Sequence, residues 1–318
     1  MRPLILIGLL ALSPLSAFAA PDAQAIDAAT YEGGPLPEGQ SAITAKVQVL
    51  LDRANISPGV IDGFRGGMTT SAISAFETRE GLAVDGQMDA EVWARLGGAE
   101  ASRVSRTHTV TEEDLARVTG SLPEDYAELA EKDLLGYADA AEALAEKFHL
   151  DVDFLRALNP GGDFSAGSEI HVLDVQERAE GAVAEIEINK TTGRLIARAE
   201  DGSIVANYPV AVGSSQTPSP DGTFEVTAVA IDPTYSYNPD LNFKQGDNDE
   251  PLTLPPGPNG PVGIVWIDLD KPTFGIHGTP EPARLFSEQS HGCVRMTNWD
   301  ARELAGMVSQ GVSVAFVE

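Results

Sequence analysis

The sequence predicts a multidomain protein. It consists of a small all-α domain of three helices, a short α/β middle segment, and a mainly-β C-terminal domain that extends to the end of the chain. Two observations carry this prediction. Apolar residues recur at helical spacing between residues 41 and 98, whereas short alternating runs separated by turn signals dominate from 182 to 318. The length of 318 residues suffices for two or three domains of roughly 100–200 residues each.

Composition and charge narrow the class of protein. Hydrophobic residues make up 42% and charged residues 22% of the chain, as in ordinary globular proteins. Lys plus Arg number 21 and Asp plus Glu number 48, so the formal net charge is −27. Phosphate and anionic-lipid recognition both need basic patches, so we expect neither nucleic acid nor an anionic membrane surface as partner. General solubility is the simplest reason for the acidic excess.

The first 19 residues have the pattern of a secretory signal peptide. Met1-Arg2-Pro3 precedes an apolar run from Leu4 to Leu12, and Ala17-Phe18-Ala19 provides an A-x-A cleavage site. An uncleaved anchor helix is the alternative, but the run falls short of the ~20 residues that span a bilayer. No later segment is long enough either. We therefore expect cleavage after Ala19 and an exported, periplasmic protein without a transmembrane helix.

Residues 20–40 lack a sustained apolar period and are rich in Gly, Pro and Asp, which predicts a disordered linker. Helices are then expected over about 45–54 and 70–80 and from about Asp89, with Thr69 or Thr70 as the N-cap of the second. The order of core and turn residues across 41–98 is Gln48, Ile61-Asp62-Gly63, Thr70, Ala72-Ile73, Phe76, Gly81-Leu82, Asp85-Gly86, Trp93 and Leu96. This order resembles the three-helix peptidoglycan-binding domain of cell-wall enzymes. Such core and turn positions identify a fold better than a ligand. The alternative that this domain is a helical spacer without binding activity therefore stays open.

A second linker is expected over 99–107, and the middle segment extends over 107–175. Helices are predicted over 138–148 and 152–158 and a strand over 169–173. Leu155, Leu158-Asn159-Pro160 and Gly167-Ser168-Glu169-Ile170 resemble the second half of a lysin motif, which implies glycan binding. The motif's usual Gly-Asp-Thr start is absent, and Tyr137-Ala138-Asp139 stands near that place. Structural or surface roles are expected for His149 and His171.

The C-terminal domain, 182–318, is expected to be an antiparallel sandwich or barrel. Turns at Thr191-Thr192-Gly193 and Asp201-Gly202 separate alternating segments, and a long loop is expected over 232–260. Further strands are predicted over 262–269 and 273–277. A helix from Trp299 to about Ser309, capped by Thr297 or Asn298, precedes the last strand.

Cys293 is the only cysteine, which excludes an intramolecular disulfide and leaves either a buried filler or a reactive thiol. It ends the stretch Ser290-His291-Gly292-Cys293, and His277-Gly278-Thr279 precedes it. A free thiol has a pKa of about 8.5, and a nearby imidazole favours the nucleophilic thiolate. A Cys–His pair therefore suits acyl transfer, with backbone N–H groups near Gly292 as candidates for an oxyanion site. From the residues alone, either His277 or His291 can serve as the base.

The spacing from His277-Gly278-Thr279 to Ser290-His291-Gly292-Cys293 and Arg295 resembles the signature of L,D-transpeptidase catalytic domains. Further agreement, in order, comes from Tyr208–Gly213, Thr217-Pro218, Asp221–Phe224 and Pro258–Gly263. The resemblance implies Cys293 as nucleophile and His277 as general base. It also implies that Ser290, His291 and Gly292 shape the substrate site and that Arg295 fixes the loop or meets a substrate carboxylate.

The same resemblance implies the reaction and the partners. Cys293 attacks the amide between the third and fourth residues of a tetrapeptide stem, D-alanine leaves, and a neighbouring stem amine resolves the thioester into a 3–3 cross-link. Water or an outer-membrane protein amine are alternative acceptors. Peptidoglycan stems and glycan strands are the expected partners, carbapenems the expected inhibitors, and neither a cofactor nor a metal is expected.

Three other readings stay open at this point. His277, His291 and Cys293 supply only three ligands for zinc, without the paired motif of a structural site. A wall-binding protein without enzymatic activity suits the upstream domains. A papain-like protease places its His after its Cys, which is the reverse of the order found here.

Overall fold

The computed structural model describes residues 20–175, 179–214, 216–240, 243–287, 290 and 292–318. The expected signal peptide and His291 lie outside these residues. Across the described ranges, no helix combines the length and the apolar character needed to cross a membrane.

The three-helix domain is confirmed. It consists of α2 (Ala42–Arg53), α3 (Gly67–Glu80) and α4 (Ala90–Arg95). Asp89 caps α4 by accepting hydrogen bonds from two backbone amides. The expectation that Thr69 or Thr70 caps the second helix is wrong, because α3 begins earlier, after Gly66. The Thr69 hydroxyl instead donates to the carbonyl oxygen of Phe64 at 3.0 Å, inside the domain.

Residues 20–40 are not a disordered linker. They contain α1 (Ala23–Ala28), whose N-cap is Asp22. Ile26 and Leu36 are buried in the same core as α2 and α3. The buried Lys46 ammonium donates to the carbonyl oxygens of Asp27 and Ala29 at 2.8 and 2.9 Å. Isolated apolar anchors fix this segment, and isolated anchors produce no periodic pattern in a sequence.

The middle segment is α/β, as predicted. It begins with a strand that lies partly in residues 99–107, where a linker was expected. The strand β1 (Ser105–Thr109) pairs antiparallel with β2 (Glu169–Leu173). Its residues are mostly polar and exposed, so they lack the apolar alternation of a half-buried strand. Between the two strands lie α5 (Glu112–Leu115), α6 (Tyr126–Ala130), α7 (Ala140–Lys147) and α8 (Val152–Leu158). The similarity to a lysin motif stays a prediction.

The C-terminal domain is built on one eight-stranded sheet in the order β11-β10-β9-β6-β12-β3-β4-β5. The strands are β3 (Glu185–Asn189), β4 (Arg194–Arg198), β5 (Ile204–Pro209), β6 (Gly222–Ile231), β9 (Val265–Leu269), β10 (Gly275–His277), β11 (Val294–Arg295) and β12 (Ser313–Val317). Neighbours run antiparallel except for two parallel pairs, β3 with β12 and β10 with β11. Just past β5, Ala211 exchanges two backbone hydrogen bonds of 2.9 Å with Arg295 of β11. This link between the two edge strands gives the domain its barrel-like character.

Two further elements complete this domain. The helix α9 (Asn298–Met307) follows the cysteine motif, and the Thr297 hydroxyl accepts from the amide of Asp300 at its N-cap. The expectation of a long loop over 232–260 is wrong in part, because β7 (Tyr235–Tyr237) and β8 (Leu252–Leu254) form a separate antiparallel pair there. Each of these strands has only three residues, too few for alternation to reveal them.

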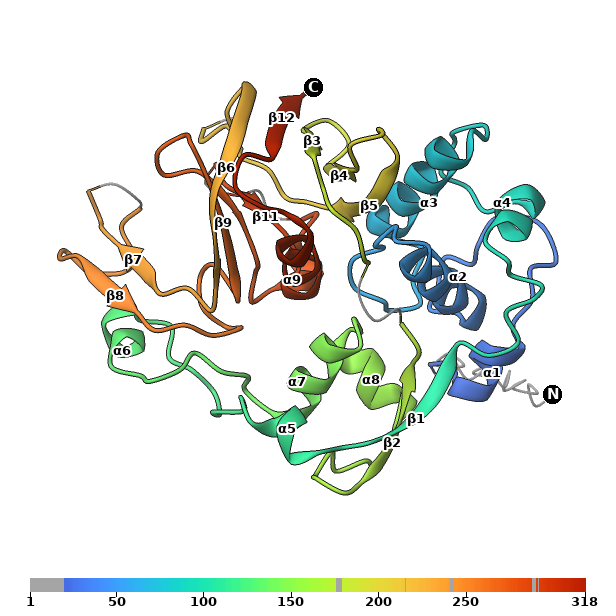
Figure 1. The fold of residues 1–318 in the computed structure, drawn as a ribbon. Helices are drawn as coiled ribbons and strands as arrows, with labels where there is room; N and C mark the ends of the chain where they lie inside the picture. The colour runs from blue at the N-terminus through green and yellow to red at the C-terminus, as the bar shows by residue number, and fades with distance from the viewer. Residues whose placement is uncertain (1–19, 176–178, 215, 241–242, 288–289, 291) are drawn as a thin grey trace, which may run out of the picture.

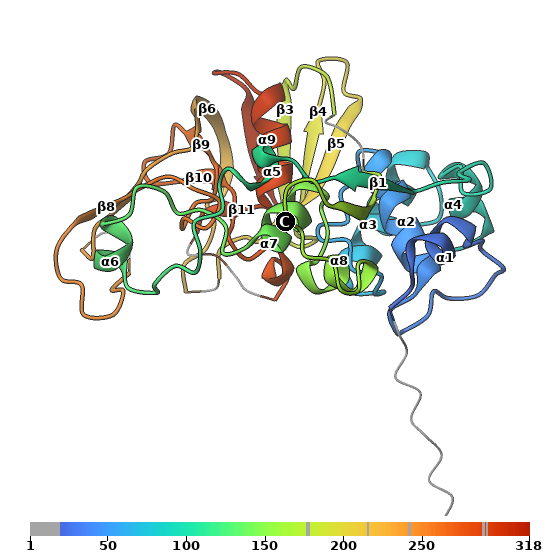
Figure 2. The same ribbon diagram turned by 90° about the horizontal axis from the view of Figure 1, so that it is seen from below.

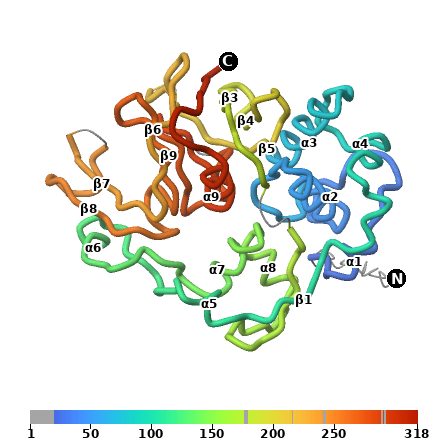
Figure 3. The backbone as a smooth tube through the Cα atoms, viewed as in Figure 1, coloured from blue at the N-terminus to red at the C-terminus, as the bar shows by residue number. Residues whose placement is uncertain are grey.

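The three units lie around one another rather than in a row (Figure 1). The helical domain packs beside β5, where the amide of Ser57 donates to the carbonyl oxygen of Asn207 at 2.9 Å. The tube view traces the middle segment from the α1 side of the molecule to β7 and β8 (Figure 3). In the view from below, α6 lies against β8, far from α1 to α4 (Figure 2). The middle segment thus contacts both neighbouring domains.

Candidate active site

The two predicted catalytic side chains come from neighbouring strands. His277 ends β10, and Cys293 immediately precedes β11. The parallel register pairs Ile276 with Val294 and His277 with Arg295. Continuing this register places Cys293 beside Gly275, two residues before His277. Because side chains two residues apart project from the same face of a sheet, Cys293 and His277 share one face.

The His277 ring is held in one orientation and one tautomer. Its Nδ1 atom lies 2.7 Å from the carbonyl oxygen of Gly278. A carbonyl oxygen only accepts, so Nδ1 carries the proton and Nε2 is left as the basic nitrogen. The ring stacks on the Trp266 indole, with centroids 5.7 Å apart and an interplanar angle of 17°.

Burial sets the charge of this histidine. Desolvation lowers the pKa of His277 to about 4, with a smaller lowering from the positive charge of Arg295, against an opposing effect of the hydrogen bond to Gly278. The imidazole is therefore neutral at neutral pH. A neutral ring with an unprotonated Nε2 is the form that can accept a proton from a thiol.

The thiol is also neutral at rest. Burial raises the pKa of Cys293, and a hydrogen bond from the backbone of Gly275 opposes this in part. The Sγ atom lies 3.5 Å from the carbonyl oxygen of Thr273, which stabilises the protonated thiol as a donor. The pair is thus a thiol and an imidazole, not a preformed ion pair, and the proton must move as the sulfur attacks.

The loop before Cys293 is held by two serines. The Ser290 hydroxyl donates to the carbonyl oxygen of Cys293 and accepts from the amide of Gly292 at 3.1 Å. The buried Ser219 hydroxyl donates to the carbonyl oxygen of Gly292 at 2.7 Å and accepts from the amide of Gly213 at 2.9 Å. Gly292 has a φ of 119°, which a residue with a side chain adopts only with strain. The hydrogen bond to Ser290 means that the Gly292 amide already has a partner within the loop.

Gly278 lies where β10 meets α9. A Cβ atom at this position would stand 2.1 Å from Oδ1 of Asn298, well inside van der Waals contact. Asn298 is fully buried and donates to the carbonyl oxygen of Pro258 at 3.1 Å and to Glu146 of the middle segment at 3.0 Å. The absence of a side chain thus lets Gly278 lie directly against Asn298. This contact fixes the Gly278 carbonyl group, which accepts the hydrogen bond from His277.

A groove of about 840 Å³ lies next to the pair. Trp266, which stacks on His277, and Thr273, which contacts Cys293, both line it. A further part of the lining comes from the β7–β8 hairpin, including Tyr235 and Tyr237. Burial raises the pKa of Tyr235 to about 12, with a smaller contribution from the nearby Cys293. The groove has room for an extended peptide along the reactive face.

The structure brings together Cys293, His277, Ser290, Gly292 and Arg295 of the residues expected from sequence. His291 lies outside the described residues, so its expected role stays a prediction. Sequence reasoning missed the Gly278 carbonyl group, Ser219 and Trp266. Ser219 follows the noted Thr217-Pro218, but its contact with Gly292 joins residues 73 apart, and one sequence carries no signal for such a pair. Within the described ranges, no three His, Cys, Asp or Glu side chains are grouped for a metal ion.

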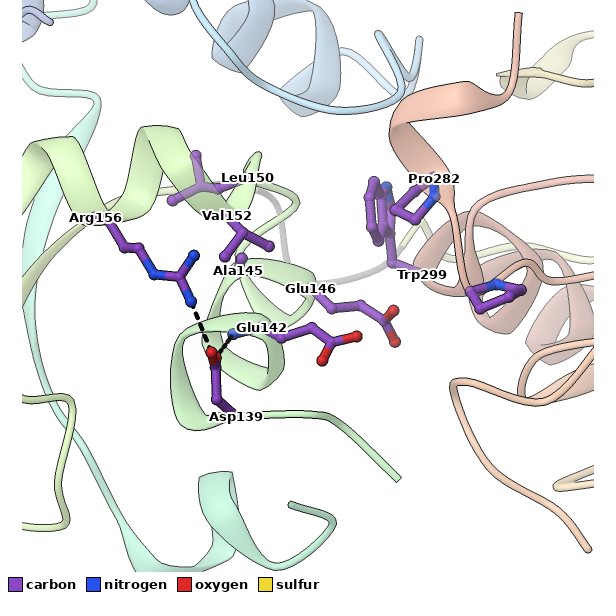
Figure 4. Close-up of a pocket in the computed structure, with 10 residues that line it drawn as sticks. Asp139, Glu142, Ala145, Glu146, Leu150, Val152, Arg156, Pro282 and Trp299 are labelled. Atoms are coloured by element: carbon purple, nitrogen blue, oxygen red, sulfur yellow. Dashed lines mark hydrogen bonds and ion pairs between the residues drawn. The ribbon is translucent and has the colours of Figure 1, made fainter. Parts of the chain in front are cut away.

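A second, smaller cavity is separate from this site. It has about 230 Å³ and lies between the middle segment and the start of α9. Figure 4 shows Trp299 and Pro282 on one side and Glu142 and Glu146 on the other. Neither Cys293 nor His277 lines it.

Comparisons with known proteins agree with this architecture. Residues 184–316 match the family described as L,D-transpeptidase catalytic domain, and residues 40–96 match the putative peptidoglycan binding domain. The putative L,D-transpeptidase YkuD of Bacillus licheniformis is 30% identical over 182 residues, which are 56% of this chain and 93% of the relative. The probable L,D-transpeptidase YbiS of Escherichia coli is 26% identical over 216 residues, covering 63% of this chain and 69% of the relative.

Among solved structures, a mutant of the Enterococcus faecium L,D-transpeptidase has 22% identity and a TM-score of 0.32. The alignment covers 48% of this chain and 54% of that protein, so the chain spans about half the length of this solved relative. Fold and site together define a multidomain protein whose mainly-β C-terminal domain has a cysteine and a histidine on one sheet face. The near-complete coverage of the Bacillus relative shows that this chain belongs to the L,D-transpeptidase family.

Proposed function

We propose that this chain is a peptidoglycan L,D-transpeptidase that forms 3–3 cross-links through a thioester on Cys293. The observation that carries the proposal is the placement of Cys293 and a neutral His277 on one face of adjacent strands. The adjacent groove of about 840 Å³ supports a peptide substrate. The match of residues 40–96 to the peptidoglycan-binding domain supports the wall as the site of action.

In the first step, Nε2 of His277 takes the thiol proton while Sγ attacks the carbonyl carbon between the third and fourth stem residues. The protonated imidazole then gives this proton to the leaving amine, and D-alanine departs. In the second step, the side-chain amine of a diamino acid on another stem attacks the thioester. His277 takes the proton of that amine and returns it to sulfur.

Burial is the reason that these steps suit this pair. Neither group is charged before attack, so no ion pair has to be desolvated when the peptide enters. Charge develops only as the tetrahedral oxyanion forms, where preorganised donors contribute most. Arg295, beside His277 in the strand pair, places a positive charge close to that developing negative charge.

Export to the periplasm, with cleavage of residues 1–19, is part of this proposal. Two alternatives share its first step and differ in the acyl acceptor, which is water or an outer-membrane protein amine. A wall-binding protein without enzymatic activity shares none of the chemistry. Carbapenems are expected to acylate the same sulfur.

The test is digestion of purified sacculi with the enzyme, followed by mass analysis of the muropeptides. Products with 3–3 cross-links are expected with the wild type and not with Cys293→Ala. Shortened tripeptide stems alone would move the acceptor to water. Unchanged muropeptides with the folded wild type would contradict an enzymatic role in the wall.

A further inference from the structure

The β7–β8 hairpin forms one wall of the groove, yet it does not belong to the large sheet. Among the described strands, β7 and β8 pair only with each other. A two-stranded hairpin of this length is at best marginally stable alone. Its position over the groove therefore depends on what lies behind it.

The middle segment provides that support. We use the name α6 clamp for residues 122–136, which pack against the hairpin. The Tyr126 ring lies edge-on to Tyr237 and Tyr235, with centroids 5.1 and 6.3 Å away and interplanar angles of 84°. Leu129 and Leu135 of the clamp are buried in one cluster with Tyr237 and Leu254 of the hairpin. Figures 1 and 2 both place α6 beside β8.

Polar contacts fix the register between clamp and hairpin. The Gln245 side chain donates to the carbonyl oxygen of Glu124 at 2.9 Å and accepts from the amide of Tyr126 at 3.1 Å. Asn248 donates to the Asp125 carboxylate at 3.2 Å. These bonds join the clamp to the loop between β7 and β8. Helix α6 is thereby tied to the hairpin through backbone groups as well as through rings.

A second tie holds the far end of the hairpin. The amide of Leu135 donates to the carbonyl oxygen of Pro256 at 2.9 Å, and the amide of Asn259 donates to the carbonyl oxygen of Leu135 at 3.0 Å. Gly257 packs so closely that a Cβ atom there would stand 2.2 Å from that Leu135 oxygen. The hairpin is therefore held at both ends by a segment outside the matched family domain, which covers residues 184–316.

We propose that the α6 clamp is a positioning element that sets the groove for the extended peptide stem, and that Tyr126 is its central positioning residue. Tyr126 acts through Tyr235 and Tyr237, two residues that line the groove. The inference rests on the proposed function for the identity of the peptide. A compact acylating agent needs only the space next to Cys293, whereas a stem peptide also needs the wall of the adjacent groove that the clamp holds.

The test compares full-length variants in binding, turnover and acylation. With Tyr126→Ala, the KM for a disaccharide-tetrapeptide should rise about tenfold, as loss of aromatic pairing at the wall predicts, while kcat changes less than about twofold. The Kd of the same muropeptide on the Cys293→Ala background should weaken by the same factor. The rate of carbapenem acylation of Cys293 should stay at the wild-type value.

Two controls separate positioning from folding. Tyr126→Phe keeps the ring and should restore the wild-type KM. Tyr31→Ala removes a comparable ring, 6.3 Å from Trp93 in the helical domain, and should leave KM unchanged. An unchanged KM and Kd with folded Tyr126→Ala would overturn the proposal. Equal losses in KM and in carbapenem acylation would also overturn it, because the clamp would then act on Cys293 itself.

A second variant covers the case in which Tyr126→Ala does not fold. Gln245→Ala removes the two side-chain bonds to the clamp and leaves the rings in place, so KM and Kd should weaken about threefold. No change in either value would contradict the proposal. Failure of the proposed function is distinct, since it shows as no carbapenem adduct on the wild type.

Discussion

Cys293 and His277 are both held in their neutral forms by burial. The family resemblance identified the two residues, but the charge state depends on neighbours that a sequence does not reveal. The Trp266 indole that covers His277 and the Gly278 carbonyl oxygen that fixes its tautomer are properties of the folded sheet. Ser290 was expected to shape the site, and its hydroxyl does hold the loop around Cys293.

The depressed pKa of His277 predicts the pH dependence of the first step. The imidazole is base-competent above its pKa of about 4 and is lost as base below it. The kcat/KM for a stem tetrapeptide should therefore stay level from pH 7 to about pH 5 and fall with a midpoint near pH 4. Circular dichroism at each pH checks that the protein stays folded. A midpoint near 6.5 would show that the base is exposed.

Replacement of the base tests its identity. His277→Ala should slow acylation of Cys293 by about 10²–10⁴-fold, the usual contribution of a positioned general base. His291→Ala is the matched control and should slow acylation far less. Stopped-flow acylation with a carbapenem measures both rates. The reverse order would move the base to His291.

The elements divide into those that periodicity revealed and those that it did not. Helices α2, α4 and α9 and strand β2 lie close to their predicted positions, because each has a clear apolar period or cap. Helix α1 was missed, since isolated side chains such as Ile26 anchor it. The β7–β8 hairpin was missed because three-residue strands are too short to alternate visibly.

The contact between β10 and α9 gives an element-scale prediction. Gly278→Ala should lower the free energy of unfolding by about 1–3 kcal/mol, as for other overpacked sites, because the new methyl group meets Asn298. It should also slow acylation, because the carbonyl group that orients His277 has to move. Urea denaturation and carbapenem acylation measure the two effects.

Gly306→Ala, at a glycine within α9, is the matched control. No atom lies within 4 Å of a Cβ built there, so alanine should stabilise α9 by about 0.5–1 kcal/mol. Acylation should be unaffected. If Gly278→Ala were as stable and as active as Gly306→Ala, the close approach of Gly278 to Asn298 would have no role in the site.

At the scale of the whole molecule, polar groups are buried where the three units meet. His149 of the middle segment contacts Asp52 of the helical domain at 2.9 Å and stacks on Trp299 of α9. Asp300 accepts a hydrogen bond of 2.9 Å from Ser57. A single sequence carries no signal for such a junction, since each partner lies in a different domain and only the fold brings them together.

The burial of Asp300 predicts that the stability of this junction depends on pH. Burial raises the pKa of Asp300 to about 7, partly offset by the nearby His149. A carboxyl whose pKa is raised on folding is protonated in the folded state while already ionised in the unfolded chain, so it costs stability as pH rises from about 4 to 7. Asp300→Asn removes this cost.

The Tm of Asp300→Asn relative to wild type should therefore increase between pH 5 and pH 7 and stay constant above pH 7. Calorimetry across this range measures the difference. Asp240→Asn, which removes an exposed carboxylate, is the control for the change in net charge. A difference for Asp300→Asn that does not change with pH would show that the Asp300 carboxyl is not desolvated at the junction.

The proposed chemistry of this L,D-transpeptidase family member depends on Cys293 as its nucleophile. Intact-mass spectrometry after incubation with a carbapenem detects this role, because the adduct forms in the shared first step whatever the final acceptor is. If Cys293 is the nucleophile, the wild type should carry one covalent adduct and Cys293→Ala none. An adduct that persists on folded Cys293→Ala would contradict it.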